Sequence, residues 1–406
     1  MKPCQSIVCV LIVPCLLAGC SSPESADHAF SISEVDGVTI AATSGGPKYI
    51  DELFEYEELF HLEQDESRDE TLLSEAQTAR MDEGGYIYVT DSGNDRIAVF
   101  NPDGAFSHSM GRDGAGPGEF RDPRLLGILG DTILVTDNTL ARTLLFQRDG
   151  TFIRSFGYTR INMADNVPII TMHAWPGPDG ESVLIQQRMG MTESGQSFEF
   201  RASVVSSERE IITHLSAPTT LMPRDYEGFP MMHYFPGLGI GRFLIEEPAL
   251  EIFNLDGTLI KEIRIEYEPE PVTEADRDLV RRDLQQQMEE ELNDARRRNM
   301  RRRLDSLSFP NTKSFWYSIT LSSDGYLWAS VPRNTWNADV NGARQRVLNP
   351  EGEYLGVTTF PDIPGFSPRA QVDHGHLIYM YEDEETGAPV IRVFRIHSAI
   401  RGFTYP

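Results

Sequence analysis

Short runs of alternating apolar and polar residues recur along the chain, and turn residues separate them. Residues 87–91 (IYVTD) and 96–100 (RIAVF) form one pair of runs, and residues 133–137 (ILVTD) and 142–146 (RTLLF) repeat it. An Asp-Gly dipeptide follows each pair, at 103–104 and 149–150, and is a strong hairpin signal. Because alternation with a period of two indicates strands, each unit is predicted to form a four-stranded antiparallel sheet.

The spacing between the two units is constant. Asp91 and Asp137, Arg96 and Arg142, and Gly111 and Gly157 are each 46 residues apart. Short strands repeated at such a period are typical of β-propeller blades. The repeat is less regular further along the chain, in segments 179–207, 241–265, 318–357 and 376–398. We therefore expect an all-β, six-bladed propeller, with a seven-bladed ring as the alternative.

The segment from Val38 to about Glu63 contains strand-like pieces but no complete unit. It is expected to supply the outer strand of the last blade and so close the ring. Closure of this kind removes exposed sheet edges, which would otherwise favour aggregation.

Residues 272–309 interrupt the strand pattern and are predicted to be a helical insertion. Thr273 and Asp276 are typical of a helix start, and apolar residues follow at helical spacing. Glu289–Glu291 precede six arginines within positions 296–303, an order that suits the helix dipole. A solvated insertion explains this pattern. A partner-docking arm, a lid over the channel, and contact with anionic lipid head groups are alternatives.

The N-terminus has the features of a secretory signal. Lys2 is followed by an apolar stretch over residues 7–13 and then by Leu17-Ala18-Gly19-Cys20, which resembles a bacterial lipobox. Residues 1–19 are thus expected to be removed and Cys20 to be lipidated. Residues 20–35 would be the lipidated N-terminus and linker, and residues 36–406 a single propeller. Ordinary signal cleavage nearby is the alternative.

Cysteine usage and charge narrow the function. All four cysteines lie within residues 1–20, so the body lacks disulfides, cysteine-bound zinc and a cysteine nucleophile. The formal net charge of −26 disfavours nucleic acid as a partner.

The repeat units resemble NHL repeats. The segments GYIYVTDSGNDRIAVFNPDG and DTILVTDNTLARTLLFQRDG, together with the lipobox, resemble bacterial six-bladed propeller lipoproteins of the NHL and TolB-like class. The resemblance is close over residues 84–157 and loose over 169–400. It implies a lipid-anchored protein of the bacterial cell envelope, with Ser21 favouring the outer membrane. Within each repeat, Asp91 with Arg96 and Asp137 with Arg142 are expected to form structural cross-strand pairs.

Two sets of residues that break the repeat are candidate ligand-binding residues. The glycine-rich link 111–124 carries Arg112, Arg121 and Arg124, which could bind an anion at the rim, although a turn without ligand also explains it. His173, His233 and His374 lie near the expected starts of three blades. In His374-Gly375-His376 the two imidazoles are expected on one face of a strand.

These observations favour a binding or scaffold module for a protein, peptide or small envelope ligand at the top face and central channel. No catalytic residue and no cofactor are predicted. A metal-dependent lyase or hydrolase, with a divalent metal held by the histidines in the channel, is the alternative function. A passive structural module in an envelope complex is a third.

Overall fold

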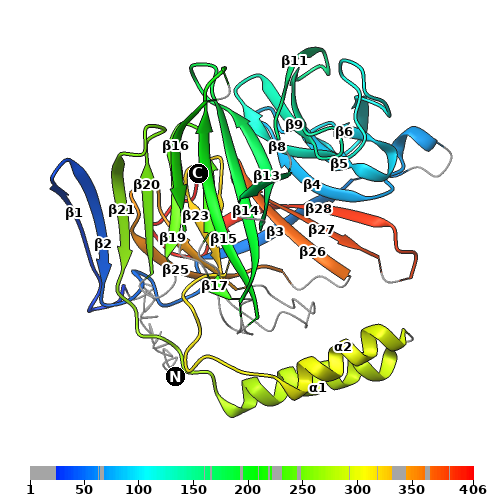
Figure 1. The fold of residues 1–406 in the computed structure, drawn as a ribbon. Coiled ribbons are helices and arrows are strands. Elements are labelled where there is room, and N and C mark those ends of the chain that lie inside the picture. Colours follow the sequence, from blue (N-terminus) through cyan, green and yellow to red (C-terminus); the bar gives the residue numbers. More distant parts are fainter. Residues whose placement is uncertain are drawn as a thin grey trace, which may run out of the picture.

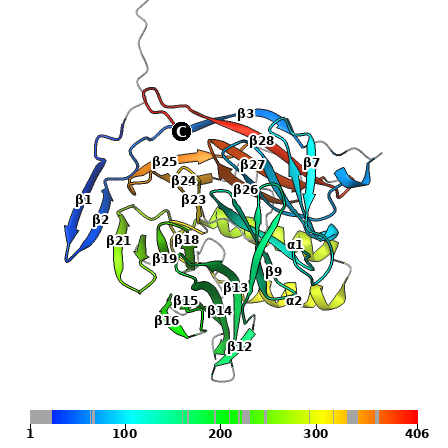
Figure 2. The ribbon, with the colours of Figure 1, turned by 90° about the horizontal axis from the view of Figure 1, so that it is seen from above.

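The computed structural model describes residues 24–406 except 63, 65–67, 160, 165–166, 193–194, 209, 218–219, 222–230, 245–247, 292, 318, 332–343, 362–365 and 384. Six β-sheets are arranged around a common axis (Figures 1 and 2). The chain is a six-bladed β-propeller with one helical insertion, which confirms the predicted fold class and excludes the seven-bladed alternative. The predicted signal peptide and Cys20 lie outside the described residues.

The first two blades correspond to the two clear repeat units. Blade 1 contains β4 (Ala76–Met81), β5 (Ile87–Asp91), β6 (Arg96–Phe100) and β7 (Phe106–Met110). Blade 2 contains β8 (Pro123–Leu129), β9 (Thr132–Asp137), β10 (Arg142–Gln147) and β11 (Phe152–Gly157). Short 3-10 helices, η1 (Asp69–Thr71) and η2 (Ser92–Asn94), lie before β4 and between β5 and β6.

The third and fourth blades are larger than the repeat predicts. Blade 3 contains β12 (Ile161–Ala164), β13 (Val167–Pro176), β14 (Ser182–Thr192), β15 (Gly195–Val205), β16 (Ile211–Ser216) and β17 (Thr220–Leu221). Blade 4 contains β18 (Met231–Phe235), β19 (Gly239–Leu244), β20 (Ala249–Phe253) and β21 (Leu259–Ile265), and the N-terminal hairpin β1 (Ala29–Val35) and β2 (Val38–Ser44) extends its outer edge.

The last two blades complete the ring. Blade 5 contains β22 (Ile319–Leu321), β23 (Leu327–Ser330), β24 (Arg344–Leu348) and β25 (Tyr354–Thr359). Blade 6 contains β26 (Phe366–Asp373), β27 (His376–Glu382), β28 (Pro389–Ser398) and, as its outer strand, β3 (Phe54–His61).

The segment that closes the ring is shorter than expected. Strand β3 pairs antiparallel with β28, so an early part of the chain closes the last blade as predicted. Residues 38–44 do not take part, because β2 pairs parallel with β21 of blade 4. The expectation for Val38–Glu63 therefore holds only for its second half.

The core consists of apolar clusters between neighbouring blades. Ile87 and Val89 pack against Ile378 of blade 6, whereas Tyr88, between them in sequence, packs toward Ile133 of blade 2. All five residues of β5 are buried because both faces of a blade are covered by its neighbours. This burial explains why Ile87–Val89 of β5 and Ile133–Val135 of β9 are continuously apolar.

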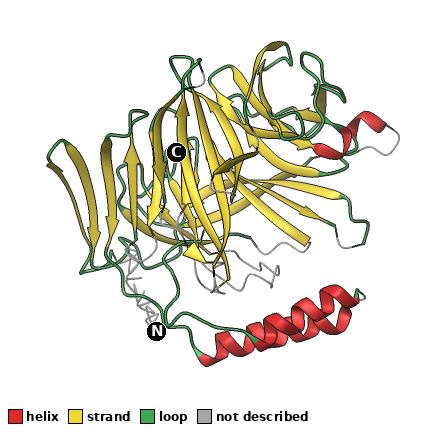
Figure 3. Cartoon of the chain, viewed as in Figure 1, coloured by secondary structure: helices red, strands yellow, loops and turns green. Residues whose placement is uncertain are grey.

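The helical insertion consists of two helices, α1 (Glu274–Glu290) and α2 (Asp294–Asp305), which lie to one side of the sheets (Figure 3). A capping box between Thr273 and Asp276 starts α1, and the Asn293 side chain caps α2. Val280 packs with Val272, Leu307 and Phe309 at the base of the insertion. No helix among the described residues is long and apolar enough to span a membrane.

Candidate functional site

The inner strand of each blade faces the axis of the ring, and four of these strands carry polar side chains. They are Arg80 on β4, His173 on β13, His233 on β18, and Gln371 and Asp373 on β26. We call these five residues the axial cluster. Each member of the cluster lies within three residues of the end of its inner strand that leads into the first turn of the blade.

Arg80 and Asp373 link blades 1 and 6. The Arg80 Nη1 atom lies 3.1 Å from Asp373 Oδ1, and the backbone N–H of Met81 donates to Asp373 Oδ2 at 3.3 Å. Burial raises the pKa of Asp373, and the Arg80 charge and the Met81 N–H oppose this shift only in part. The pair therefore places the Arg80 guanidinium near the ring axis, where the buried Asp373 carboxylate balances its charge.

The two histidines are neutral at physiological pH. Burial, and then the charges of His173 and Arg80, lower the pKa of His233 to about 4. Burial also lowers the pKa of His173. Because a neutral imidazole has one N–H donor and one acceptor nitrogen, each ring can both donate and accept a hydrogen bond. The structure thus brings two of the three predicted histidines close enough to affect each other electrostatically.

Several polar atoms of the axial cluster are buried and have no hydrogen-bond partner among the residues that the structure describes. These atoms are Arg80 Nε, His173 Nδ1 and Gln371 Nε2. An unpaired buried donor costs about 1–3 kcal/mol, and native proteins contain few of them. Arg80 Nε and Gln371 Nε2 are donors, and His173 Nδ1 is a donor or an acceptor according to the tautomer, so hydrogen-bond acceptors of a ligand could satisfy these atoms.

Bulges in the inner strands help to place these side chains. The pairing register shifts within β4, β8, β13 and β26. In β13 the shift falls between Thr171 and His173, so Met172 is the extra residue. Bulges reorient the side chains beside them and occur frequently near functional sites.

His374 is not part of the axial cluster, and the expectation that it shares a strand face with His376 is wrong. Asp373 pairs directly with His376, which places His374 and Gly375 in the tight turn between β26 and β27. His374 has a positive φ of 47°, and its backbone N–H donates to Ser323 Oγ. His374 therefore lies in the turn and His376 at the start of β27, so the two imidazoles do not share one face of a strand.

The arginines of the link 111–124 are largely engaged with acidic neighbours. Arg112 pairs with Glu119 at 2.9 Å, and Arg124 pairs with Asp122 at 3.2 Å. Arg121 is exposed. Burial and the carboxylates of nearby acidic residues raise the pKa of Asp95 on the same face. Because acidic side chains neutralise most of the arginine charge of the link, this face of the propeller has little positive charge available to bind an anion.

The link has a structural explanation instead. Glu119 accepts hydrogen bonds from Arg112 and from the backbone N–H of Gly116, and the ring of Phe120 packs against Gly111. Gly111 has a φ of +76°, and a Cβ there would lie 1.9 Å from the Phe120 ring. Glycine is required at this position because a larger residue would collide with the ring.

The two repeated Asp and Arg pairs differ in their contacts. Asp91 is fully buried and pairs with Arg96 at 2.8 Å. Asp137 is equally buried, but it accepts the backbone N–H groups of Arg121 and Leu140. Among the described residues it forms no ion pair with Arg142, which donates instead to three carbonyl groups of the link, at residues 115, 116 and 119. Arg142 and Asp137 are cross-strand neighbours in register as expected, but the expected ion pair between them is not found in the described part of the chain.

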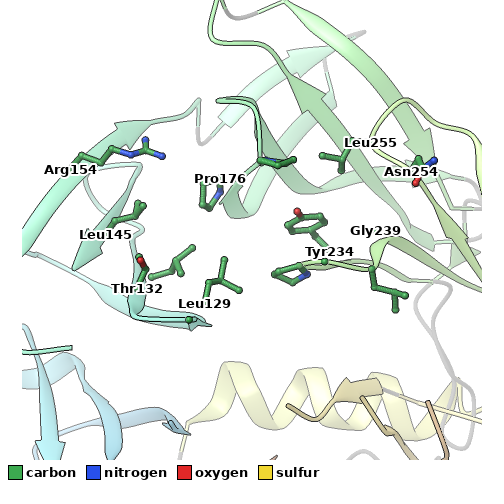
Figure 4. A pocket seen from close by; sticks show the side chains of 16 residues that line it. Leu129, Thr132, Leu145, Arg154, Pro176, Tyr234, Gly239, Asn254 and Leu255 are labelled. Carbon is green, nitrogen blue, oxygen red and sulfur yellow. The ribbon is translucent and has the colours of Figure 1, made fainter. Parts of the chain in front are cut away.

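A pocket of about 620 Å³ opens among blades 2, 3 and 4 (Figure 4). Its walls are mainly apolar, with Leu129, Leu145 and Tyr234 around it, while Arg154 and Asn254 add polar groups. Apolar walls with a few polar groups are typical of small-molecule sites. Tyr234 follows His233 in β18, so the pocket and the axial cluster share a strand.

No pattern in the sequence points to Arg80, Gln371 or Asp373 as site residues. Arg80 and Asp373 are separated by 293 positions and meet only because the ring closes. Among the described residues, no three His, Asp or Glu side chains are grouped as a metal site would require.

Comparisons with known proteins agree with the architecture. Residues 48–126 match a family model described as a 6-bladed beta-propeller. The chain has no significant match among curated proteins.

Similar solved structures include a "Putative exported protein" from Bacteroides fragilis (13% identity, 85% of this chain and 95% of that chain, TM-score 0.48). A member of the duf4221 family from Bacteroides vulgatus is also similar (13% identity, 86% and 99%, TM-score 0.46). A third is virginiamycin B lyase from Staphylococcus aureus (12% identity, 84% and 99%, TM-score 0.39).

Proposed function

We propose that the protein is a lipid-anchored binding module of the bacterial cell envelope. Its axial cluster would bind a small envelope ligand, or the end of a peptide or protein, through carbonyl or carboxylate oxygens. The lipobox ending at Cys20 supports the location, with anchoring to the outer membrane as the specific proposal. The buried, unpaired donors of the axial cluster are the observation that carries the binding proposal.

The chemistry of the axial cluster favours an acceptor-rich ligand. Arg80 and Gln371 each present a buried N–H that has no partner among the described residues, and a neutral His173 can donate or accept. A ligand oxygen would satisfy these donors and recover the cost of leaving them unpaired. A carboxylate would gain additional attraction from the Arg80 guanidinium.

Isothermal titration calorimetry with a short acetylated alanine peptide tests this proposal. The peptide with a free C-terminal carboxylate is compared with the same peptide as its amide. Saturable binding that is tighter for the carboxylate is expected. Absence of heat from both forms at millimolar concentration would contradict the proposed ligand class.

Two variants test the location of the site. Gln371→Leu and His173→Phe are each expected to weaken binding by about five- to a hundredfold, because each substitution removes a side-chain group that would form a hydrogen bond with the ligand. Gln147→Leu and His61→Phe make the same changes at exposed positions and serve as controls. Equal binding by all four variants would show that the ligand binds elsewhere.

A further inference from the structure

The helical insertion combines a concentration of positive charge with an acidic body. Six arginines occupy positions 296–303, whereas the whole chain has a formal net charge of −26. No residue of α2 is buried, so packing of α2 against the propeller does not explain its composition. We call the segment 272–309 the helical arm.

One face of α2 is exposed and cationic. Arg298, Arg301 and Arg302 are exposed and lie three and four positions apart, which places them on the same side of the helix. Among the described residues, neither Arg298 nor Arg301 forms an ion pair, and Arg302 donates to the neutral side chain of Asn299. Arg297, four positions before Arg301, pairs with Asp294. Arg298, Arg301 and Arg302 therefore have no acidic partner within the part of the chain that the structure describes.

The helical arm leaves the propeller beside the N-terminal segment. Ala29 pairs with Ser44, and the backbone N–H of Glu266 donates to the Thr43 carbonyl at 2.9 Å, just after β21 ends. A bridge between Pro271 and Thr312 then closes the base of the arm. In Figure 1 the start of β1, the end of β21 and both helices lie on the same side of the ring.

This proximity connects the helical arm to the expected lipid anchor. Cys20 precedes the first described residue, Glu24, by four positions, which can span at most about 14 Å. A lipid on Cys20 would therefore hold this side of the propeller near the bilayer. A cationic helix face beside an anchor is complementary to anionic lipid head groups, each arginine near such a surface contributing about fivefold in affinity.

We propose that the exposed arginine face of α2 binds the anionic surface of the membrane that holds the anchor. Contact at two points, the lipid and the arm, would orient the propeller as well as tether it. The first turns of the blades, near which the axial cluster lies, would then point away from the bilayer. This proposal does not depend on a ligand at the axial cluster.

Vesicle co-sedimentation tests the proposal on the chain beginning at Ser21, which retains every described element. The vesicles contain either phosphatidylcholine alone or equal parts of phosphatidylcholine and phosphatidylglycerol. Binding to the anionic vesicles only is expected, together with its loss in about 1 M salt, where the Debye length is about 3 Å. Equal binding to both compositions, or no binding to anionic vesicles at low salt, would overturn the proposal.

A matched pair of triple variants separates the helical arm from general charge. Arg298→Gln, Arg301→Gln and Arg302→Gln together are expected to weaken binding about a hundredfold. Arg121→Gln, Arg154→Gln and Arg401→Gln remove the same charge from exposed positions on the propeller and are expected to leave binding unchanged. An equal loss in both triple variants would overturn the assignment to α2. Thermal unfolding of each variant verifies that it is folded.

The anchored, full-length protein provides a second measurement. Trypsin cleavage within the helical arm is expected to be slower in anionic than in neutral vesicles, and the α2 variant is expected to lose this protection. Cleavage at the same rate in both membranes would contradict the proposed contact. Protection that appears only after addition of an envelope protein extract would assign α2 to a protein partner and would also overturn the proposal.

Discussion

Protonation of His233 should destabilise the folded protein. The pKa of this imidazole falls from 6.5 to about 4 on folding, because burial and the charges of His173 and Arg80 disfavour the imidazolium. Between these two values the unfolded chain binds more protons than the folded chain, so stability falls as the pH falls. The contribution of His233 is fully present above pH 6.5 and is lost as the pH approaches 4.

The magnitude follows from the shift. Each pKa unit corresponds to about 1.4 kcal/mol, so complete protonation costs at most about 3 kcal/mol, and lowering the pH from 7.5 to 5 costs about 2 kcal/mol. His173 acts in the same direction because burial lowers its pKa too. Asp373 acts in the opposite direction at acidic pH, since its pKa is raised. A comparison with a variant at His233 is therefore needed to isolate the effect.

Urea unfolding monitored by tryptophan fluorescence, at pH 7.5 and pH 5, measures this contribution. When the pH is lowered from 7.5 to 5, the free energy of unfolding of His233→Gln is expected to fall by about 2 kcal/mol less than that of the wild-type protein. His397→Gln, at a more exposed position, provides the control and is expected to behave like the wild type. The same pH dependence in His233→Gln and the wild type would refute the argument that His233 is held neutral.

Three further predictions concern stability and processing. Asp91→Ala removes the buried partner of an ion pair and should lower the free energy of unfolding in urea by about 3–5 kcal/mol. Asp103→Ala, at an exposed turn, should lower it by less than about 1 kcal/mol, and similar losses in the two variants would contradict the role assigned to Asp91. Gly111→Ala should lower the free energy of unfolding by at least about 2 kcal/mol more than Gly37→Ala, because both glycines have a positive φ but only Gly111 lies against the Phe120 ring. Equal melting curves for the two variants would contradict this contact. Cys20→Ser should abolish lipid attachment measured by mass spectrometry, and a lipidated variant would locate the acylated residue elsewhere.

The propeller could be predicted from the sequence because its repeat is local. Asp91 and Arg96 lie five residues apart on neighbouring strands, and their spacing alone indicates the pair that the structure contains. Asp137 and Arg142 are cross-strand neighbours too, but among the described residues they form no ion pair, and Arg142 donates to carbonyl groups of the glycine-rich link instead. A repeated motif therefore predicts position more reliably than it predicts the contact made there.

The axial cluster could be predicted only in part. His173 and His233 were identified as residues that break the repeat, but their mutual influence depends on how the blades close around the axis. Arg80 and Asp373 come from the first and last blades, so no local pattern connects them. The position of His374 was predicted wrongly because the sequence His374-Gly375-His376 also fits an alternating strand. In the structure His374 has a positive φ and lies in a turn.

The most direct test of the proposed binding site follows the histidine resonances by NMR while the acetylated alanine peptide with a free carboxylate is added. Binding at the axial cluster predicts saturable shifts of the His173 and His233 imidazole signals, with little change at the more exposed His397. It also predicts that Gln371→Leu weakens the response. Saturation without any shift of His173 and His233 would contradict the central claim that the ring axis is the binding site.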